Sequence, residues 1–491
     1  MDILKGYVEA FNRDDEETCR NLIDNEAALG WLREEIPLLE CPDKDIERTY
    51  YFRFWTYRKH LKHTEDGYVI TEFLPNVPWS GKHNTINAAV GHHLCEGRWL
   101  KNASLYLNDY VEFFLSVSEK SHMYSTWLID AVYKLFSVTG AKELDKGLIN
   151  KLVKYYEKWE ELHGLDNGMF WSIDNYDAME YSISGTSEEW PQKRGIRPTL
   201  NSYMCADALA LSRLAAAVGE NEISARFMHK HLRLKEQING LLWKDGFYRA
   251  FHYKDGESIE DTLKSAVSSE VREEIGYIPW MFNIPEGGKE AAFDLLTDES
   301  AFFSEQGITT AERSHRRFLY KADHECLWNG YVWPFATSQT LTALINLIDN
   351  YEGTERFKEV FIKLLTQYAV SHHRVREDGK TVCWIDEVRH PLYDDWSSRT
   401  ILRDWGWQRQ GKGGYERGKD YNHSTFCDLV ISGLIGIKTD SGELRVNPSI
   451  PDDWDYFRLS NLHFRGKCYT VTYDKHGTKY GSGKGLTVTE E

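Results

Sequence analysis

STWLIDAVYKLFSVTG (125–140) and LINKLVKYYEKWEEL (148–162) show the pattern that decides the fold of this chain. Both stretches carry apolar residues at i, i+3 and i+4, which is the spacing of an amphipathic α-helix. A glycine closes the first stretch, as glycine often does at the end of a helix. We read the two stretches as a pair of neighbouring helices.

The same pattern recurs in pairs from about residue 85 to residue 437. Further examples are NSYMCADALALSRLAAAVG (201–219), FATSQTLTALINLIDNY (335–351) and HSTFCDLVISGLIGI (423–437). At roughly 30 residues per helix and loop, the region holds about a dozen helices. That number suits a ring of six helical hairpins, an (α/α)6 toroid, as well as an α-solenoid. A solenoid should show a repeated consensus, and none is present, so we expect the toroid.

After Ile437 the pattern changes to one that is typical of strands. FRLSNLHF (457–464) and CYTVTYD (468–474) alternate apolar and polar residues, which predicts a small antiparallel β region. A region of this size is too small to be stable alone, so we expect it to pack on the helices. ERTYYFRFWTYRKHL (47–61) has no decisive period and leaves helix and strand open.

The predicted fold is therefore mainly α, with three parts. Residues 1–83 form an N-terminal helical and loop segment packed on the barrel, residues 84–437 form the (α/α)6 barrel, and residues 438–491 form the C-terminal β subdomain.

The net charge of −17 limits the possible partners. An acidic chain repels nucleic acid and anionic lipid, so we expect neither as a partner. No apolar run reaches the roughly 20 residues that a membrane span needs, and no signal peptide is visible at the N-terminus. We expect a cytoplasmic enzyme, or a periplasmic one if a signal peptide has been removed. The sequence does not give the oligomeric state.

The eight cysteines are scattered singly and form no CxxC pair. We interpret them as reduced and mostly buried thiols, and we expect neither a disulfide framework nor a metal site. No twelve-residue calcium loop is present, and no glycine-rich phosphate loop lies between a strand and a helix. The sequence therefore predicts no cofactor.

Seventeen tryptophans and twenty-eight tyrosines are more than a core requires. Such an excess beside charged residues suits carbohydrate, because sugar faces stack on aromatic rings while hydroxyl groups take polar partners. Packing between helices is the alternative explanation.

Two acidic loops carry the candidate chemistry. In GMFWSIDNYDAMEY (168–181), Asp174, Asp177 and Glu180 lie among aromatic residues. A carboxyl group there loses solvation, which raises its pKa toward that of a useful general acid; the alternative is one charged face of a helix. In WIDEVRHPLYDDW (384–396), Asp386 and Glu387 could include a base that activates water, or could form an acidic surface turn.

The loops that hold such residues all lie at corresponding positions in the repeated helical hairpins. In a barrel of hairpins these loops meet at one end, where we expect a carbohydrate-binding pocket. The candidate substrate-binding residues are Trp79, Lys82, His83, Trp171, Asp174, Glu180, Arg197, Asn201, Trp328, Asn329, Trp333, Trp384, Glu416 and His423. Two carboxylates among aromatic rings is the arrangement of a glycoside hydrolase.

Residues 65–437 resemble the six-hairpin glycosidases, in particular glycoside hydrolase family 63 and the related mannosylglycerate-hydrolase-like group. DNYD (174–177) is similar to the motif that holds the acid of the family, which implies Asp177 as the catalytic acid. EVRHPL (387–392) is similar to the motif of the base, which implies Glu387 as the catalytic base. WNGYVWPFATSQTL (328–341) is similar to a segment that precedes a barrel helix in these families.

The chain departs from the base motif at His390 and at the YDD that follows the proline, which leaves Glu416 as a reserve base. The resemblance implies inversion, with Asp177 protonating the leaving oxygen and Glu387 activating a water. We expect an inverting exo-acting glycoside hydrolase on an α-linked glucose or mannose residue. The alternatives are a β-L-arabinofuranosidase or α-L-rhamnosidase on the same toroid, or a non-catalytic carbohydrate-binding protein.

Overall fold

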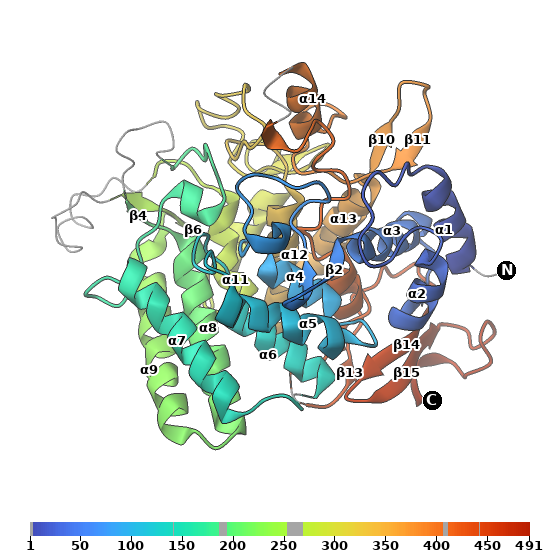
Figure 1. Ribbon diagram of the computed structural model, residues 1–491, viewed down its shortest axis with the longest axis horizontal. Helices are drawn as coiled ribbons and strands as arrows, with labels where there is room; N and C mark the ends of the chain where they lie inside the picture. Colours follow the sequence, from blue (N-terminus) through green and yellow to red (C-terminus); the bar gives the residue numbers. More distant parts are fainter. Residues whose placement is uncertain (1–2, 141, 186–193, 253–268, 406–410, 441) are drawn as a thin grey trace.

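An inner ring of helices forms the centre of the molecule (Figure 1). The computed structural model describes residues 3–140, 142–185, 194–252, 269–405, 411–440 and 442–491. Among these residues, the inner ring consists of α4 (Val90–Gly97), α6 (Leu128–Thr139), α8 (Pro198–Ala217), α11 (Ile278–Met281), α12 (Pro334–Asn350) and α15 (Phe426–Asp428). Each inner helix contacts the next, and the ring closes because α15 contacts α4 and is continued by η8 (Leu429–Leu434), which contacts α12.

A second layer of helices packs outside this ring. Its members are α3 (Lys44–His60), α5 (Ala103–Glu112), α7 (Lys146–His163), α9 (Asn221–Gln237) and α13 (Phe357–Val370). The outer α7 buries one stripe that includes Leu152, Tyr156 and Trp159, whereas the inner α8 is buried on nearly all sides. This difference is what the two layers require, because only the outer helices have a face in water. The predicted mainly helical toroid is confirmed.

The aromatic segment around residues 47–61 forms helix α3. The Asp43 side chain caps its start by accepting hydrogen bonds from the backbone N–H groups of Asp45 and Ile46. Nearly every residue from Ile46 to His60 is buried, because α3 lies between α1 (Ile3–Arg13) on one side and α13 and α15 on the other. A helix buried on all faces has no apolar stripe, and this explains why its period could not be read from the sequence.

One glycine fixes how closely the inner helices approach. A Cβ atom on Gly91 of α4 would lie 2.2 Å from the Trp127 ring, directly before α6. Only glycine fits this contact, so the backbone of α4 rests on the face of the indole.

The C-terminal residues form an antiparallel sheet, as predicted. Its strand order is β1 (Leu38–Glu40), β14 (Tyr456–Phe464), β15 (Lys467–Asp474) and β16 (Gly485–Glu490), with a bulge in β14 between Leu459 and Leu462. Strand β1 comes from the N-terminal segment, and it pairs Leu39 with Leu459. Helix α2 (Ala28–Glu35) precedes β1, and Figure 1 shows the sheet beside it.

Short elements complete the described chain. The paired strands are β2 (Leu61–Thr64) with β3 (Gly67–Ile70), β4 (Gly195–Ile196) with β7 (Phe251–His252), β5 (Trp243–Lys244) with β6 (Phe247–Tyr248), β8 (Phe303–Ser304) with β9 (Gly307–Ile308), β10 (His373–Val375) with β11 (Thr381–Cys383), and β12 (Ile437–Lys438) with β13 (Arg445–Val446). The short helical segments are η1 (Lys82–Asn84), η2 (Phe113–Val117), η3 (Asp174–Asp177), η4 (Ile238–Leu242), η5 (Glu274–Tyr277), η6 (Glu290–Leu296) and α14 (Ser397–Asp404).

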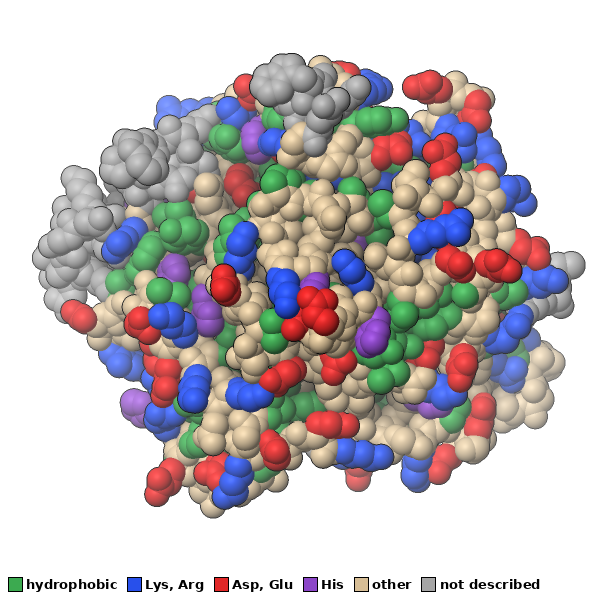
Figure 2. All heavy atoms as spheres, in the orientation of Figure 1, with side chains coloured by type: hydrophobic (Ala, Val, Ile, Leu, Met, Phe, Trp, Pro, Cys, Tyr) green, Lys and Arg blue, Asp and Glu red, His purple; other side chains and the backbone are tan. Residues whose placement is uncertain are grey.

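Acidic and basic side chains alternate over the face of the molecule in Figure 2, and no single-sign patch dominates this view. Within the described residues, no helix has both the length and the apolar character needed to cross a bilayer.

Candidate active site

A cavity of about 270 Å³ lies where the loops before the inner helices meet. The loop before α4 contributes Trp79, the turn before α8 contributes Glu180, and the loop before α12 contributes Trp328. His423 comes from the loop before α15, and Glu387 comes from the loop before α14. The predicted convergence of loops therefore brings several carboxyl groups and aromatic rings around one space.

Glu180 is held in the wall of this cavity by an unusual turn of the backbone. Ala178 and Tyr181, which flank it, both adopt positive φ angles, of 56° and 63°. Such angles are uncommon for residues other than glycine and mark a constrained turn. Burial raises the pKa of the Glu180 carboxyl to about 8, with a further contribution from the charges of Asp174 and Glu387. Glu180 therefore carries a proton at neutral pH.

Glu387, the second carboxylate, has a different environment. Its Oε2 accepts a hydrogen bond of 3.0 Å from the guanidinium of Arg417, and its Oε1 lies 3.5 Å from the Cys326 thiol. Arg417 is buried and lies over the rings of Trp79 and Phe73. Glu387 is therefore held in place by a buried cation, whereas Glu180 lies in the wall with a raised pKa.

Glu72 is a third carboxyl group in the wall. It accepts hydrogen bonds from Trp79 Nε1, at 3.1 Å, and from the Ser80 hydroxyl, so its position is fixed. Burial raises its pKa to about 7, although these two hydrogen bonds act in the opposite direction. The charge of Glu387 adds to the increase.

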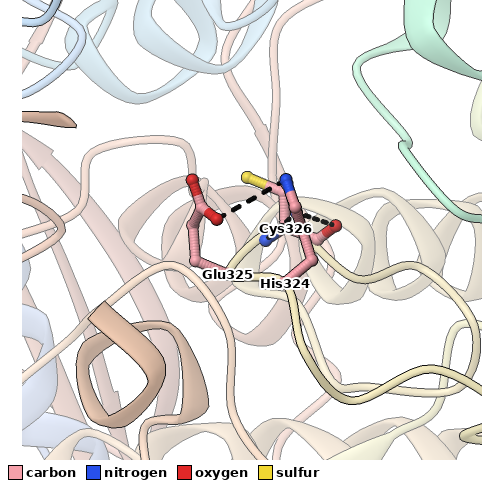
Figure 3. Close-up of side chains that lie close together, drawn as sticks. All are labelled: His324, Glu325 and Cys326. Atoms are coloured by element: carbon pink, nitrogen blue, oxygen red, sulfur yellow. Dashed lines mark hydrogen bonds and ion pairs between the residues drawn. The ribbon is translucent and has the colours of Figure 1, made fainter. Parts of the chain in front are cut away.

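His324, Glu325 and Cys326 form a compact group beside the cavity (Figure 3). Their imidazole, carboxylate and thiol are ligand types that zinc accepts. Glu325, however, is already paired with Lys412 and with Arg417. Burial, with the charges of Glu387 and Glu325, raises the pKa of the Cys326 thiol well above its usual range. Glu325 is thus paired with two cations, its Oε2 lies 3.5 Å from His324 Nε2, and the Arg417 guanidinium lies 3.6 Å from Cys326 Sγ, so we interpret the group as a charge network.

Aromatic rings make the remaining walls. Trp328 and Trp333 stack with their centroids 4.4 Å apart, and Phe335 meets Trp328 edge to face. Trp333 Nε1 donates to the Leu327 carbonyl, which fixes the orientation of the pair. Rings held in this way offer flat surfaces to the faces of a sugar.

Asp177, the acid that the sequence motif implies, lies outside the lining of this cavity. It is buried, and its Oδ2 accepts a 2.6 Å hydrogen bond from Arg197. Ser125, Ser172 and Thr199 donate to the same carboxylate. With both oxygens occupied and a guanidinium beside it, this group holds loops together, and its placement does not support a role as proton donor.

Several other residues predicted to bind substrate also lie outside the cavity lining, for reasons that the structure makes clear. Lys82 and His83 pair with Asp66 on the turn between β2 and β3. Asn201 holds the backbone of Phe170 and of Arg197.

Trp171 lies under Arg194, and Asn329 is buried and donates to the Lys321 carbonyl. Asp174 lines a small void of about 10 Å³ together with Arg197.

Glu416, the reserve base, is ion-paired with Arg399 at 2.7 Å and lies outside the cavity. Trp384 lines a different and larger cavity of about 580 Å³, between α1, the start of α3 and the β10–β11 hairpin. Neither Glu180 nor Glu387 borders that space. We therefore place the chemistry in the smaller cavity.

Asp386 fixes the loop that carries Glu387. It is buried, and its Oδ1 accepts hydrogen bonds from the backbone N–H of Glu387, at 2.8 Å, and from the Ser398 hydroxyl, at 2.9 Å. A Cβ atom on Gly418 would lie 2.1 Å from the same oxygen. Glycine at 418 therefore lets the loop that carries Arg417 pack directly on the loop that carries Glu387.

The sequence analysis did not select Glu72, Glu325 or Arg417 as site residues. Glu72 follows an apolar strand and precedes a loop with two prolines and Trp79, which was the available signal. Arg417 lies in a glycine-rich loop with many other charged or polar residues, and nothing in that sequence distinguishes it from its neighbours.

Two family models match this chain. Residues 82–424 match the profile of the family described as "Mannosylglycerate hydrolase MGH1-like glycoside hydrolase domain". Residues 437–489 match "Glycosyl hydrolase family 65, C-terminal domain". A curated protein of Borreliella burgdorferi, described as uncharacterized, is 30% identical over 158 residues, which are 32% of this chain and 29% of that protein.

Solved structures give the same fold. A chain titled "Sialidase" matches with a TM-score of 0.87 and 36% identity, over 99% of this chain and 42% of that chain. A GH63 mannosylglycerate hydrolase from Thermus thermophilus, in complex with glucose, matches with a TM-score of 0.51 and 12% identity, over 74% of this chain and 100% of that one. The second likeness shows the fold alone. The chain spans less than half of the "Sialidase" chain and less than a third of the curated relative.

Proposed function

We propose a mechanism on one premise, which is that the chain belongs to the family of mannosylglycerate hydrolase MGH1-like glycoside hydrolases. It is therefore a glycosidase. We infer that it is an inverting, exo-acting enzyme in which Glu180 is the general acid and Glu387 is the general base. The observation that supports this pair is that both carboxyl groups line one small cavity, in which burial raises the pKa of Glu180 and Arg417 holds Glu387 in place.

In this mechanism Glu180 donates its proton to the glycosidic oxygen as the bond to the anomeric carbon breaks. Glu387 takes a proton from a water molecule, whose oxygen attacks the anomeric carbon from the opposite face. The products are the free sugar, with inverted configuration, and the released alcohol. Glu180 replaces Asp177, three residues earlier, in the role that the sequence motif implied.

The size of the cavity supports action on the end of a chain. A volume of about 270 Å³ is small for a ligand site and suits one sugar residue between the tryptophan walls. The substrates that we propose first are α-glucosides and α-mannosides. β-L-Arabinofuranosides and α-L-rhamnosides are the alternatives, since the same toroid suits them.

The test is hydrolysis of a panel of 4-nitrophenyl glycosides of these sugars, with the configuration of the first-formed product followed by ¹H NMR. Glu180→Gln and Glu387→Gln should each lower kcat by about 10²–10⁴-fold. The two roles separate on 2,4-dinitrophenyl glycosides, whose leaving group needs no proton. The acid variant should recover activity on them, and the base variant should not.

Retention of configuration, or recovery by the Glu387 variant instead of the Glu180 variant, would contradict this assignment. Glu299→Gln, an exposed acid outside the cavity, is the matched control and should hydrolyse these glycosides as the parent protein does.

A further inference from the structure

Cys326 borders the cavity beside Glu387. It is partly exposed, and it lies in the loop before α12, two residues before Trp328. Its backbone N–H donates to Nδ1 of His324 at 3.1 Å, so the turn that carries the thiol is closed by its own side chain (Figure 3). The sulfur is therefore held at a fixed point of the cavity wall.

Two contacts of this sulfur decide where its hydrogen points. The Sγ atom lies 3.5 Å from Oε1 of Glu387 and 3.6 Å from the guanidinium of Arg417. A guanidinium carries only donors, so Arg417 donates to the sulfur. A carboxylate carries only acceptors, so the thiol hydrogen belongs to the contact with Glu387. Burial, with the charge of Glu387, raises the pKa of the Cys326 thiol well above its usual range, so the thiol keeps this hydrogen at neutral pH.

Glu387 thereby has a donor on each of its oxygens. Arg417 donates to Oε2 at 3.0 Å, and the Cys326 thiol donates to Oε1. The last torsion of a glutamate side chain is soft, because it joins an sp³ carbon to an sp² carbon. One hydrogen bond leaves the carboxylate free to turn about this torsion, whereas two donors fix its plane.

The donor on Oε2 does not depend on the thiol. Arg417 also donates to Glu325 at 3.3 Å, and its guanidinium lies 4.7 Å from the centroid of the Trp79 ring. A change at position 326 therefore removes one donor of Glu387 and leaves its ion pair in place.

From these contacts we propose that Cys326 is a positioning residue, whose thiol orients the Glu387 carboxylate toward the attacking water. The inference rests on the proposed function, in which Glu387 is the base, and it adds a residue that acts through Glu387. The water gives its proton to a lone pair of the carboxylate, and a turn of the carboxylate plane moves that lone pair out of line with the anomeric carbon. A displacement of about 1 Å can lower the rate by on the order of 100-fold.

The first test compares two substitutions of the same residue. Cys326→Ala removes the donor, whereas Cys326→Ser replaces it with a hydroxyl donor of similar size. The alanine variant should have a kcat lower by about tenfold, with a KM within about twofold of the parent value. The serine variant should keep at least about half of the parent kcat. Cys19→Ala, which changes a partly exposed cysteine outside the cavity lining, is the matched control and should leave both constants unchanged.

A parent-like kcat in Cys326→Ala would overturn the proposal. Equal losses in the alanine and serine variants would also overturn it, because a residue that only fills space gives the same loss with either side chain.

The second test does not depend on turnover. It measures how fast iodoacetamide alkylates Cys326 at pH 8, by mass spectrometry of the peptide that carries this residue. Only the thiolate reacts, and the charge of Glu387 helps to keep the thiol protonated. Glu387→Gln should therefore speed the alkylation of Cys326 by about tenfold or more, which corresponds to one unit of thiol pKa. Cys19 in the same digest, and Cys326 in Glu299→Gln, should react as in the parent protein.

Equal rates for Cys326 in the parent and in Glu387→Gln, including no reaction in either, would overturn the proposal. A parent protein that hydrolyses no glycoside would contradict the proposed function instead, and the alkylation rates would still decide whether the thiol faces Glu387.

Discussion

Replacing Asp177 with asparagine separates a structural carboxylate from a catalytic one. In the structure Asp177 Oδ1 accepts from Ser125 and Ser172, at 2.8 and 3.0 Å, and Oδ2 accepts from Arg197 and Thr199. Asparagine keeps the shape and one acceptor oxygen, so the two serine hydrogen bonds can persist. Its amide N–H₂ then faces two donors, and the Arg197 charge loses its carboxylate.

Removing one partner of a buried ion pair costs about 3–5 kcal/mol. The low end of this range applies here, because Glu273 also places its charge near Arg197, and Ser184 still accepts a hydrogen bond from Arg197. We therefore expect Asp177→Asn to lower the free energy of unfolding by about 3 kcal/mol. Hydrolysis per folded molecule should change far less than it does in Glu180→Gln.

The assay is urea unfolding at pH 7, followed by tryptophan fluorescence, together with the initial rate of glycoside hydrolysis by the folded protein. Glu416→Gln, which removes a partly exposed ion pair with Arg399, is the control and should cost at most about 1 kcal/mol. If Asp177→Asn unfolds with the parent free energy yet hydrolyses more than about 10³-fold more slowly, Asp177 is the proton donor and our reasoning is wrong.

Three further predictions concern the cavity and the ring. The kcat/KM of the parent protein should fall as the pH rises through about 8, where Glu180 loses its proton, and this limb should be absent from a pH profile of Glu180→Gln. The folded-state pKa of Glu180, about 8, lies above the ordinary value of 4.5, so the parent protein should lose stability as the pH rises from about 4.5 to about 8. Chemical unfolding at pH 8 should show Glu180→Gln more stable than the parent by at most about 5 kcal/mol. Equal stability of the two proteins would contradict the burial of this group. Gly418→Ala should lower kcat more than about tenfold, with a smaller change in KM, because the added methyl group pushes Asp386 and the loop that carries Glu387. Gly91→Ala is the control for a change in packing alone, and it should lower the melting temperature through its clash with Trp127.

The helical toroid could be predicted because its signals are local. Outer helices such as α7 show one apolar stripe, and the change of period after Ile437 predicts the strands of the C-terminal sheet. The pairing of β1 with β14 joins segments at opposite ends of the chain, Leu39 with Leu459, and no local pattern encodes it. The helix at 44–60 was ambiguous for a similar reason, because burial on every face removes its period.

The acidic loop shows where sequence reasoning reached its limit. Asp174, Asp177 and Glu180 are evenly spaced, and the motif favoured Asp177. In the structure, η3 buries the first two carboxylates, and Ala178 then turns the chain with a positive φ so that Glu180 enters the cavity wall. Alanine rarely adopts this conformation, so nothing in the sequence predicts the turn. Glu387, the predicted base, has no such turn before it and lies in the cavity lining, as expected.

The most direct test of the proposed acid and base is a single comparison by ¹H NMR. The parent protein, Glu180→Gln and Glu387→Gln are each given the 4-nitrophenyl and 2,4-dinitrophenyl forms of whichever glycoside the panel identifies. We predict an inverted first product from the parent, and recovery on the dinitrophenyl substrate by the Glu180 variant alone. Full activity of both variants on both substrates would contradict the account, because the cavity would then not be the site of hydrolysis.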